Sequence, residues 1–207
     1  MADSKTLLVE DKFYHIYNHA VGNEYLYINS ANYLYFLELF KKYLISYVDI
    51  YAYCLMPNHF HLVIKIKSEK DILAAYFEKS PTRVSNPRRA NDTVSLLISR
   101  QFSNLFNSYA QAFNKQNNRK GSLFLNRLKR KPIDTTEYLI KLIHYIHYNP
   151  MLANLCSEIS YWNFSSYNAI VNDSFTLVNR KSVLELFGGR DNFIYCHKIE
   201  PQISGIE

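Results

Sequence analysis

Two histidines separated by one residue are the side chains best suited to chemistry in this chain. His59 and His61 flank Phe60 in a stretch rich in β-forming residues. Along a strand, residues i and i+2 point to the same face, so the two imidazoles would lie side by side while Phe60 points the other way. Neutral imidazole is a strong nitrogen donor for divalent metals. The pair therefore predicts part of a metal site, and a third ligand must come from elsewhere.

A helix expected from Glu137 to Asn149 can supply the remaining groups. Its apolar residues recur at three-and-four spacing and form a face that docks on a sheet. Lys141, Tyr145 and Asn149 follow one another at i, i+4 and i+8 on a second stripe, at the edge of that face. Pro150 biases the backbone of Asn149 out of the helix, so we expect the helix to end near this proline.

These groups together suit phosphoryl transfer. Two imidazoles and the amide oxygen of Asn149 would hold one divalent ion, which polarises a phosphoryl oxygen. The hydroxyl of Tyr145 is a poor nucleophile at its ordinary pKa of ~10 and needs that help. Lys141, one turn away, is a candidate for lowering the barrier further. The product would be a covalent phosphotyrosine.

Each residue also has an ordinary structural explanation. Paired histidines on a strand more often serve packing, a tyrosine at a helix edge is commonplace, and an asparagine before proline usually ends a helix. The combination of an i, i+2 pair on a strand with an i, i+4 pair on a helix favours a site.

The charge of the chain favours a polyanionic partner. Its 207 residues carry a formal net charge of +6, and all the charged residues in the stretch 115–131 are basic. A solvated surface usually mixes signs, so such a stretch favours phosphate binding. The residues are Lys115, Arg119, Lys120, Arg127, Lys129, Arg130 and Lys131. The 18 tyrosines and 13 phenylalanines would also allow stacking on bases.

Other features narrow the class of protein. No apolar run approaches the ~18 residues of a membrane span, so we expect no membrane partner. The first ten residues lack the pattern of a secretory signal, and we expect a cytoplasmic protein. Cys54, Cys156 and Cys196 are widely separated and suit reduced packing residues.

Hydrophobic patterns predict an α+β fold. We expect strands at 13–19, 47–55 and 59–67, with a turn at 56–58, and a helix capped by Ser30 that runs to Leu44. An irregular insertion at 68–92 surrounds one short helix, and a long helix follows from about Thr93 to Lys115. A strand or loop at 121–132 carries the basic residues, and the side chains of a capping box at Asp134 and Glu137 begin the next helix. This order predicts helices packed mainly on one sheet face.

Four ordered motifs resemble the REP-associated tyrosine transposases, which are single-tyrosine HUH endonucleases. They are Met-Pro-Asn-His-Phe-His at 56–61, Gly-Ser-Leu-Phe at 121–124, Tyr-Ile-His-Tyr-Asn-Pro at 145–150 and Trp-Asn-Phe-Ser-Ser-Tyr at 162–167. The likeness runs from about Tyr14 to Tyr167. It implies a ferredoxin-like or RRM-like antiparallel sheet with the histidine pair on a central strand. It divides the chain into an endonuclease domain at 1–170 and an extension at 171–207 packed on it.

The resemblance also implies an activity. It implies cleavage and rejoining of single-stranded hairpin DNA with Mg²⁺ or Mn²⁺, through a 5′-phosphotyrosine and a free 3′-OH. By motif position, Tyr145 is the nucleophile and His59, His61 and Asn149 are the metal ligands, with Tyr148 a rival nucleophile by proximity. Arg88, Arg89 and Arg100 join the basic stretch as candidate DNA contacts. A homodimer is possible, with residues 187–193 as a cap or dimer contact.

Two other classes stay open. A non-catalytic relative would bind a nucleic-acid hairpin with steep salt dependence and form no adduct. A metal-dependent hydrolase would use a metal-bound water and leave a 5′-phosphate. The hydrolase ranks last, because two histidines and an amide supply little negative charge to retain a metal.

Overall fold

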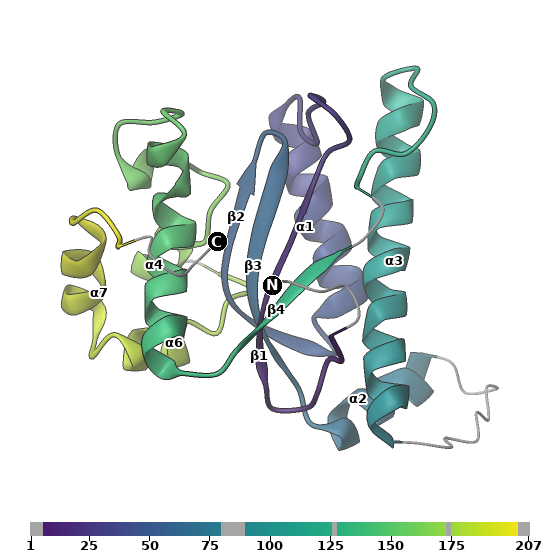
Figure 1. Ribbon diagram of the computed structural model, residues 1–207, viewed down its shortest axis with the longest axis horizontal. Coiled ribbons are helices and arrows are strands. Elements are labelled where there is room, and N and C mark those ends of the chain that lie inside the picture. Colours follow the sequence, from purple (N-terminus) through teal and green to yellow (C-terminus); the bar gives the residue numbers. More distant parts are fainter. Residues whose placement is uncertain (1–5, 80–89, 126–127, 173–174, 203–207) are drawn as a thin grey trace.

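The computed structural model describes residues 6–79, 90–125, 128–172 and 175–202. A four-stranded sheet stands between two layers of helices (Figure 1). The strands are β1 (Phe13–His19), β2 (Val48–Met56), β3 (His59–Ile66) and β4 (Lys129–Ile133). The helices are α1 (Ser30–Leu44), α2 (Glu69–Lys79), α3 (Ala90–Gln116), α4 (Thr136–Leu152), α5 (Tyr167–Val171), α6 (Arg180–Leu186) and α7 (Arg190–His197), with a 3₁₀ turn η1 (Ile159–Tyr161). In this part of the chain, none of the helices has the length and apolar composition to cross a bilayer.

The strand order confirms the expected fold class. The order is β2-β3-β1-β4, and every neighbouring pair is antiparallel. The crossover through α1 joins β1 to β2 and passes over β3, and the crossover through α3 joins β3 to β4 and passes over β1. This is the split arrangement of a ferredoxin-like sheet. The histidine pair lies on β3, which has a neighbouring strand on both sides.

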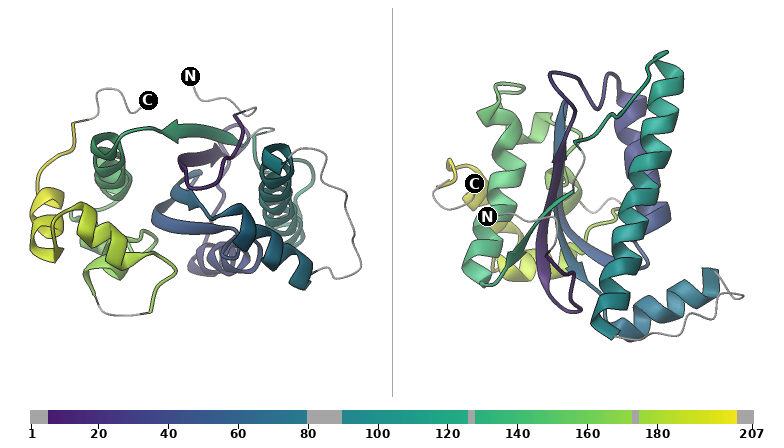
Figure 2. Two further views of the ribbon diagram at one scale, coloured as in Figure 1. Left: turned by 90° about the horizontal axis from the view of Figure 1, so that it is seen from below. Right: turned by 45° about the vertical axis from the view of Figure 1, so that its right-hand side comes forward.

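The expectation that the helices gather mainly on one face needs correction. Helices α1 and α3 cover one face, and α4 covers the other with α6 and α7 beside it (Figure 2). Alternation along β3 separates the two layers. Phe60 meets Phe36 of α1 and Phe106 of α3, whereas the ring of His61 faces Tyr145 of α4. Helices therefore cover both sides of the sheet, and α4 closes over the histidine face.

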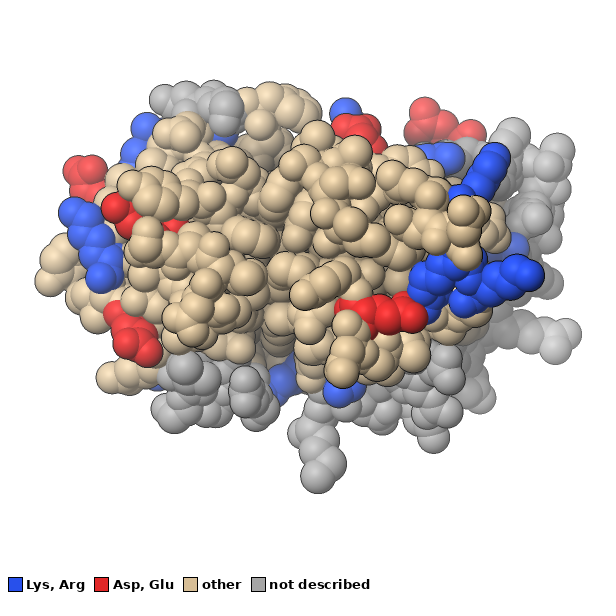
Figure 3. All heavy atoms as spheres, turned by 90° about the horizontal axis from the view of Figure 1, so that it is seen from above, with Lys and Arg blue, Asp and Glu red and all other residues tan. Residues whose placement is uncertain are grey.

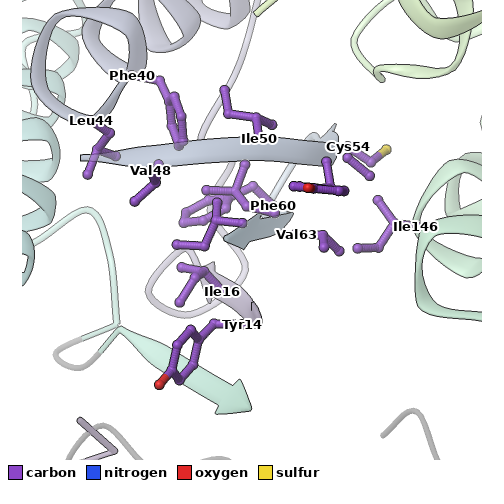
Figure 4. Close-up of a cluster of buried hydrophobic side chains, with 14 of the residues drawn as sticks. Tyr14, Ile16, Phe40, Leu44, Val48, Ile50, Cys54, Phe60, Val63 and Ile146 are labelled. Atoms are coloured by element: carbon purple, nitrogen blue, oxygen red, sulfur yellow. The ribbon is translucent and has the colours of Figure 1, made fainter. Parts of the chain in front are cut away.

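Phe60 is central to the core between the sheet and the α1–α3 layer (Figure 4). Its side chain is fully buried, with ring centroids 5.3 Å from Phe36 and 5.7 Å from Phe106. We expect Phe60→Ala to lower the free energy of unfolding by about 3–5 kcal/mol, because it removes apolar contacts and leaves a cavity. Urea denaturation measures this loss. Leu34→Ala is the matched control: that α1 side chain is 58% exposed, and its loss should change stability little.

Helix α4 ends near Pro150, as expected, but the proline itself does not end it. Pro150 lies inside the helix, which continues to Leu152, so the expectation that Pro150 biases the backbone of Asn149 out of the helix was wrong. The end is set by Asn154 in the left-handed conformation, with φ of 54°. The amide N–H of Leu155 donates to the carbonyl of Pro150, and that of Asn154 donates to Met151, as in a Schellman motif. The backbone of Asn149 therefore stays helical.

Other helix ends also differ from the sequence prediction. Asn29, not Ser30, caps α1, since its side chain accepts from the backbone N–H of Asn32. Thr135 caps α4 by accepting from Tyr138, so Asp134 and Glu137 do not form the predicted capping box. Helix α3 begins three residues earlier than predicted, at Ala90. At α1 and α4 the shifts arise because neighbouring polar residues compete for one capping position.

The segment after α4 covers the free edge of β2. The backbone N–H of Leu55 donates to the carbonyl of Phe164 at 2.9 Å, and that of Ser166 donates to Tyr53 at 2.9 Å. The indole N–H of Trp162 donates to the carbonyl of Leu55. The motif at 162–167 therefore protects the edge of β2.

The predicted division of the chain at residue 170 stays a prediction.

Candidate metal and tyrosine site

The histidine pair lies on the sheet face that α4 covers. The register of β1 against β3 places His59 opposite His19 and His61 opposite Tyr17. The rings of His59 and His61 are 5.1 Å apart and nearly perpendicular, and His19 stacks on His59 at 4.6 Å. The strand pairing thus gathers aromatic rings from β1 and β3 around the two imidazoles.

Hydrogen bonds engage the same ring nitrogen in both histidines. Nδ1 of His61 lies 2.9 Å from Nε2 of His15, and Nδ1 of His59 lies 2.7 Å from Oδ1 of Asn58. Nε2 of each ring is the nitrogen left for a metal. Burial lowers the pKa of His59 to about 4, with a smaller effect from His19, and burial also lowers the pKa of His61 well below its ordinary value. Both rings are therefore neutral near pH 7, as ligation requires.

Tyr145 lies beside the pair. Its ring centroid is 6.1 Å from that of His61, at 75°. The side chain is only 7% exposed, so a ligand from solvent needs a local opening to reach it. Tyr148 lies elsewhere: its ring is 6.0 Å from His144, and it lines a cavity with His197 on the α7 side. The structure thus brings Tyr145, and not Tyr148, next to the histidine pair.

Asn149 follows Tyr145 by one helical turn. Helix α4 runs antiparallel to β3 (Figure 1), so the step from Tyr145 to Asn149 follows the direction from His61 to His59. The step is about 6 Å along a helix, close to the ~6.6 Å between alternate strand residues. Asn149 is 8% exposed, and its Nδ2 finds no hydrogen-bond partner among the described residues. Turning the amide would present an oxygen in that position, which suits a metal ligand.

The donor set fits a weakly held divalent ion. Within the described residues, no three His, Cys, Asp or Glu side chains are arranged to hold a metal. An amide such as that of Asn149 would be the third ligand beside the two imidazoles. Amide oxygen and water suit Mn²⁺ and Mg²⁺, and imidazole is a weaker donor for these ions, so water and substrate would complete the shell.

Lys141 forms an ion pair on the surface of α4. Its Nζ is 2.8 Å from the carboxylate of Glu137 on the exposed side of α4, and its side chain is 44% exposed. Lys129 and Lys131 of β4 lie on the histidine face instead. The Nζ of Lys129 is 5.7 Å from the ring centroid of Tyr17, and that of Lys131 is 5.1 Å from Tyr138.

The remaining basic candidates fall into three groups. Arg100, Lys115 and Lys120 are exposed, and basic side chains gather on the α3 side of the upper face (Figure 3). Arg119 and Arg130 are engaged within the fold: Arg119 bonds Asn114, Gly121 and Ser122 and pairs with Glu24, while Arg130 is 8% exposed and donates to Thr6 and Ser99. Arg88, Arg89 and Arg127 lie outside the described residues.

The contribution of β1 to the site was not predicted from the sequence. His15, Tyr17 and His19 all point to the histidine face, where His15 stacks on Tyr17 at 4.7 Å. Burial, with the charge of Lys131, lowers the pKa of His15 to about 3. The signal was available in the i, i+2, i+4 spacing of these residues, but only strand pairing shows that they adjoin His59 and His61.

A second histidine cluster lies on the far side of α4. His197 Nδ1 donates to the carbonyl of Phe193 at 2.7 Å, which leaves its Nε2 to accept from His147 Nδ1 at 2.9 Å. Nε2 of His147 then accepts from the hydroxyl of Ser166 at 2.6 Å. The chain links α4 to α7 and to the segment beside β2. It requires both imidazoles to be neutral.

This second cluster predicts a loss of stability in acid. Burial lowers the pKa of His197 to about 3, against ~6.5 in an unfolded chain. Between these two pKa values the unfolded state binds a proton that the folded state does not. The contribution of His197 to the free energy of unfolding is therefore complete above pH ~6.5 and is lost as the pH falls towards 3. We expect a slope of about 1.4 kcal/mol per pH unit per proton. Urea denaturation at several pH values measures it, and His197→Gln should flatten the slope; equal slopes would contradict the assignment.

The fold resembles that of a solved transposase. No protein-family model matches the chain, and no curated protein matches it. A solved structure described as "Structure of the REP associates tyrosine transposase bound to a REP hairpin" superimposes with a TM-score of 0.54 and 13% sequence identity. The match covers 86% of this chain and 90% of that one. The chain is therefore similar to that transposase in fold over nearly its whole length.

Proposed function

We propose that the chain is a DNA strand transferase of the single-tyrosine HUH type, which cleaves and rejoins single-stranded hairpin DNA. The observation that carries the proposal is the position of Tyr145, whose ring lies 6.1 Å from that of His61. The fold shared with a hairpin-bound tyrosine transposase supports it. The imidazole pair comes from β3, whereas the hydroxyl of Tyr145 and the buried amide of Asn149 come from one side of α4, so the fold brings two distant segments together.

The chemistry follows from these groups. His59, His61 and Asn149 would hold Mg²⁺ or Mn²⁺, which withdraws charge from the scissile phosphate when bound. The Tyr145 oxygen attacks phosphorus, and the bond from phosphorus to the 3′-oxygen breaks. The phenol gives up its proton and the departing oxygen receives one, so the products are a 5′-phosphotyrosine and a free 3′-OH. Rejoining is the reverse reaction with another 3′-OH.

Exposed and half-buried cations on two sides of the sheet would hold the DNA. Lys129 and Lys131 lie on the histidine face, and Arg100, Lys115 and Lys120 lie exposed on α3 and just after it. Arg88, Arg89 and Arg127 remain candidates from the sequence. Arg119 and Arg130 would stabilise the fold around the DNA-binding surface and would not contact DNA directly, because their guanidinium groups already form hydrogen bonds within the protein.

End-labelled DNA tests the proposal. The full chain is incubated with Mn²⁺ or Mg²⁺ and a panel of single-stranded hairpins, and the products are separated on a denaturing gel. Label at the 3′ end should migrate with the protein, and label at the 5′ end should appear in a fragment that a polymerase can extend. A 5′-phosphate product without an adduct would instead indicate the hydrolase.

A hairpin-binding protein without catalysis is the second candidate. The burial of Tyr145 and Asn149, 7% and 8% exposed, favours it, since neither group is open to a phosphate in this conformation. Such a protein would bind hairpins with an affinity that falls steeply with salt. It would form no adduct with any metal in the same gel.

A further inference from the structure

His15 holds the ring of His61 from the neighbouring strand. The two rings meet through Nε2 of His15 and Nδ1 of His61 at 2.9 Å, and both side chains are buried, with 3% and 7% exposed. A neutral imidazole has one N–H and one acceptor nitrogen, so the shared proton has two possible positions. If His15 donates, the proton of His61 lies on Nε2 and blocks a metal. If His61 donates from Nδ1, its Nε2 keeps a lone pair.

His59 shows the same arrangement with a different partner. Its Nδ1 lies 2.7 Å from Oδ1 of Asn58. An amide oxygen can only accept, so Nδ1 of His59 carries the proton and Nε2 carries the lone pair. Asn58 immediately precedes the strand, at the turn where the chain reverses. Both histidines can therefore present Nε2 while Nδ1 is bonded to the protein.

We propose that His15 is a positioning residue of the metal site, which accepts the Nδ1–H of His61 and so fixes its orientation and keeps Nε2 available for the ion. The inference rests on the proposed role of His61 as a ligand. Metal-bound histidines commonly donate their second N–H to a protein acceptor, which orients the ring and raises its basicity. Asn58 does the same for His59 at a more exposed position.

A purely structural role explains His15 less well. In this arrangement the proton of His15 lies on Nδ1, which is buried and has no hydrogen-bond partner among the described residues. A buried donor without a partner is destabilising, typically by ~1–3 kcal/mol. An apolar side chain of similar volume would avoid that penalty. Stability alone therefore favours leucine at this position, and the histidine requires another reason.

Metal affinity and stability separate the two roles. The full chain is titrated with Mn²⁺ alone, and free Mn²⁺ is followed by electron paramagnetic resonance. We expect His15→Leu to bind Mn²⁺ about 10–100-fold more weakly. His15→Gln should bind close to the wild type, because its amide oxygen can accept at the position of Nε2. Thermal melting without metal should show that His15→Leu is at least as stable as the wild type.

The contrary results are distinct. Equal Mn²⁺ affinity in His15→Leu and wild type would overturn the positioning role, and so would an equal loss in His15→Leu and His15→Gln. If His61→Ala itself binds Mn²⁺ like the wild type, the proposed metal site fails and not only its support. With Mg²⁺ bound, ¹⁵N-detected spectra of the His61 ring should place its proton on Nδ1; a proton on Nε2 contradicts the inference.

Discussion

We expect Tyr145→Phe to abolish the covalent DNA adduct and to retain hairpin binding. The variant removes one oxygen atom and leaves the aromatic ring against His61, so the packing of α4 on the sheet is preserved. We expect cleavage to fall by at least on the order of a thousandfold, because only binding and electrostatic effects remain without the nucleophile. Denaturing gels with 3′-labelled hairpin measure the adduct, and a mobility shift measures binding.

The structure supplies matched controls for this variant. Tyr17 also lies beside His61, with ring centroids 5.9 Å apart, and Tyr148 is the neighbouring tyrosine on α4. Tyr17→Phe and Tyr148→Phe remove the same atom at other positions and should leave the adduct. If Tyr145→Phe still becomes linked to DNA, or if either control abolishes linkage, the nucleophile is assigned wrongly.

Replacing His59 or His61 by alanine should give the second large effect. The pair would supply two of three protein ligands, and a bound ion stabilises the transition state by several kcal/mol. Each single variant should therefore cleave on the order of 10²–10⁴-fold more slowly, with a smaller change in hairpin binding. Cleavage rates over a range of Mn²⁺ concentrations measure this loss, and added metal should restore part of the activity of a single variant.

His19→Ala is the matched control for the pair. His19 stacks on His59 at 4.6 Å from the same sheet face, and it has no place in the proposed ligand set. Its replacement should change the rate much less than that of His59. Wild-type cleavage in the double variant of His59 and His61 would show that the pair only fills the space under α4.

The basic stretch shows why composition did not predict the role of each cation. Consecutive residues of β4 alternate between faces. Lys129 and Lys131 therefore lie on the histidine face, whereas Arg130 is buried on the other side against Ser99 of α3. The basic residues of one stretch of sequence thus lie on two different surfaces, the histidine face and the α3 side, and one of them, Arg130, is a buried, hydrogen-bonded cation. The alternation is predictable from the sequence, but the layer that covers each face is not.

Local patterns in the sequence determined the secondary structure and the fold class of this protein. The alternation of β1 and β3, the three-and-four spacing of α1 and α4, and the order of these elements predicted an α+β sheet with His59 and His61 on one face. These features depend on neighbours within a few residues, where strand and helix geometry leaves little choice. The helix ends were less well predicted, because adjacent residues such as Asn29 and Ser30 can both cap a helix.

Only the tertiary structure decided which distant residues meet. The contact of Tyr145 with His61, the bond from His15 to His61 and the link between His147 and His197 each join segments separated by at least 46 positions. Such contacts depend on strand register and on the docking of α4, which are set by the packing of the whole core. Burial, and with it the neutral state of these histidines, follows from the same packing, since desolvation acts only once the layers close.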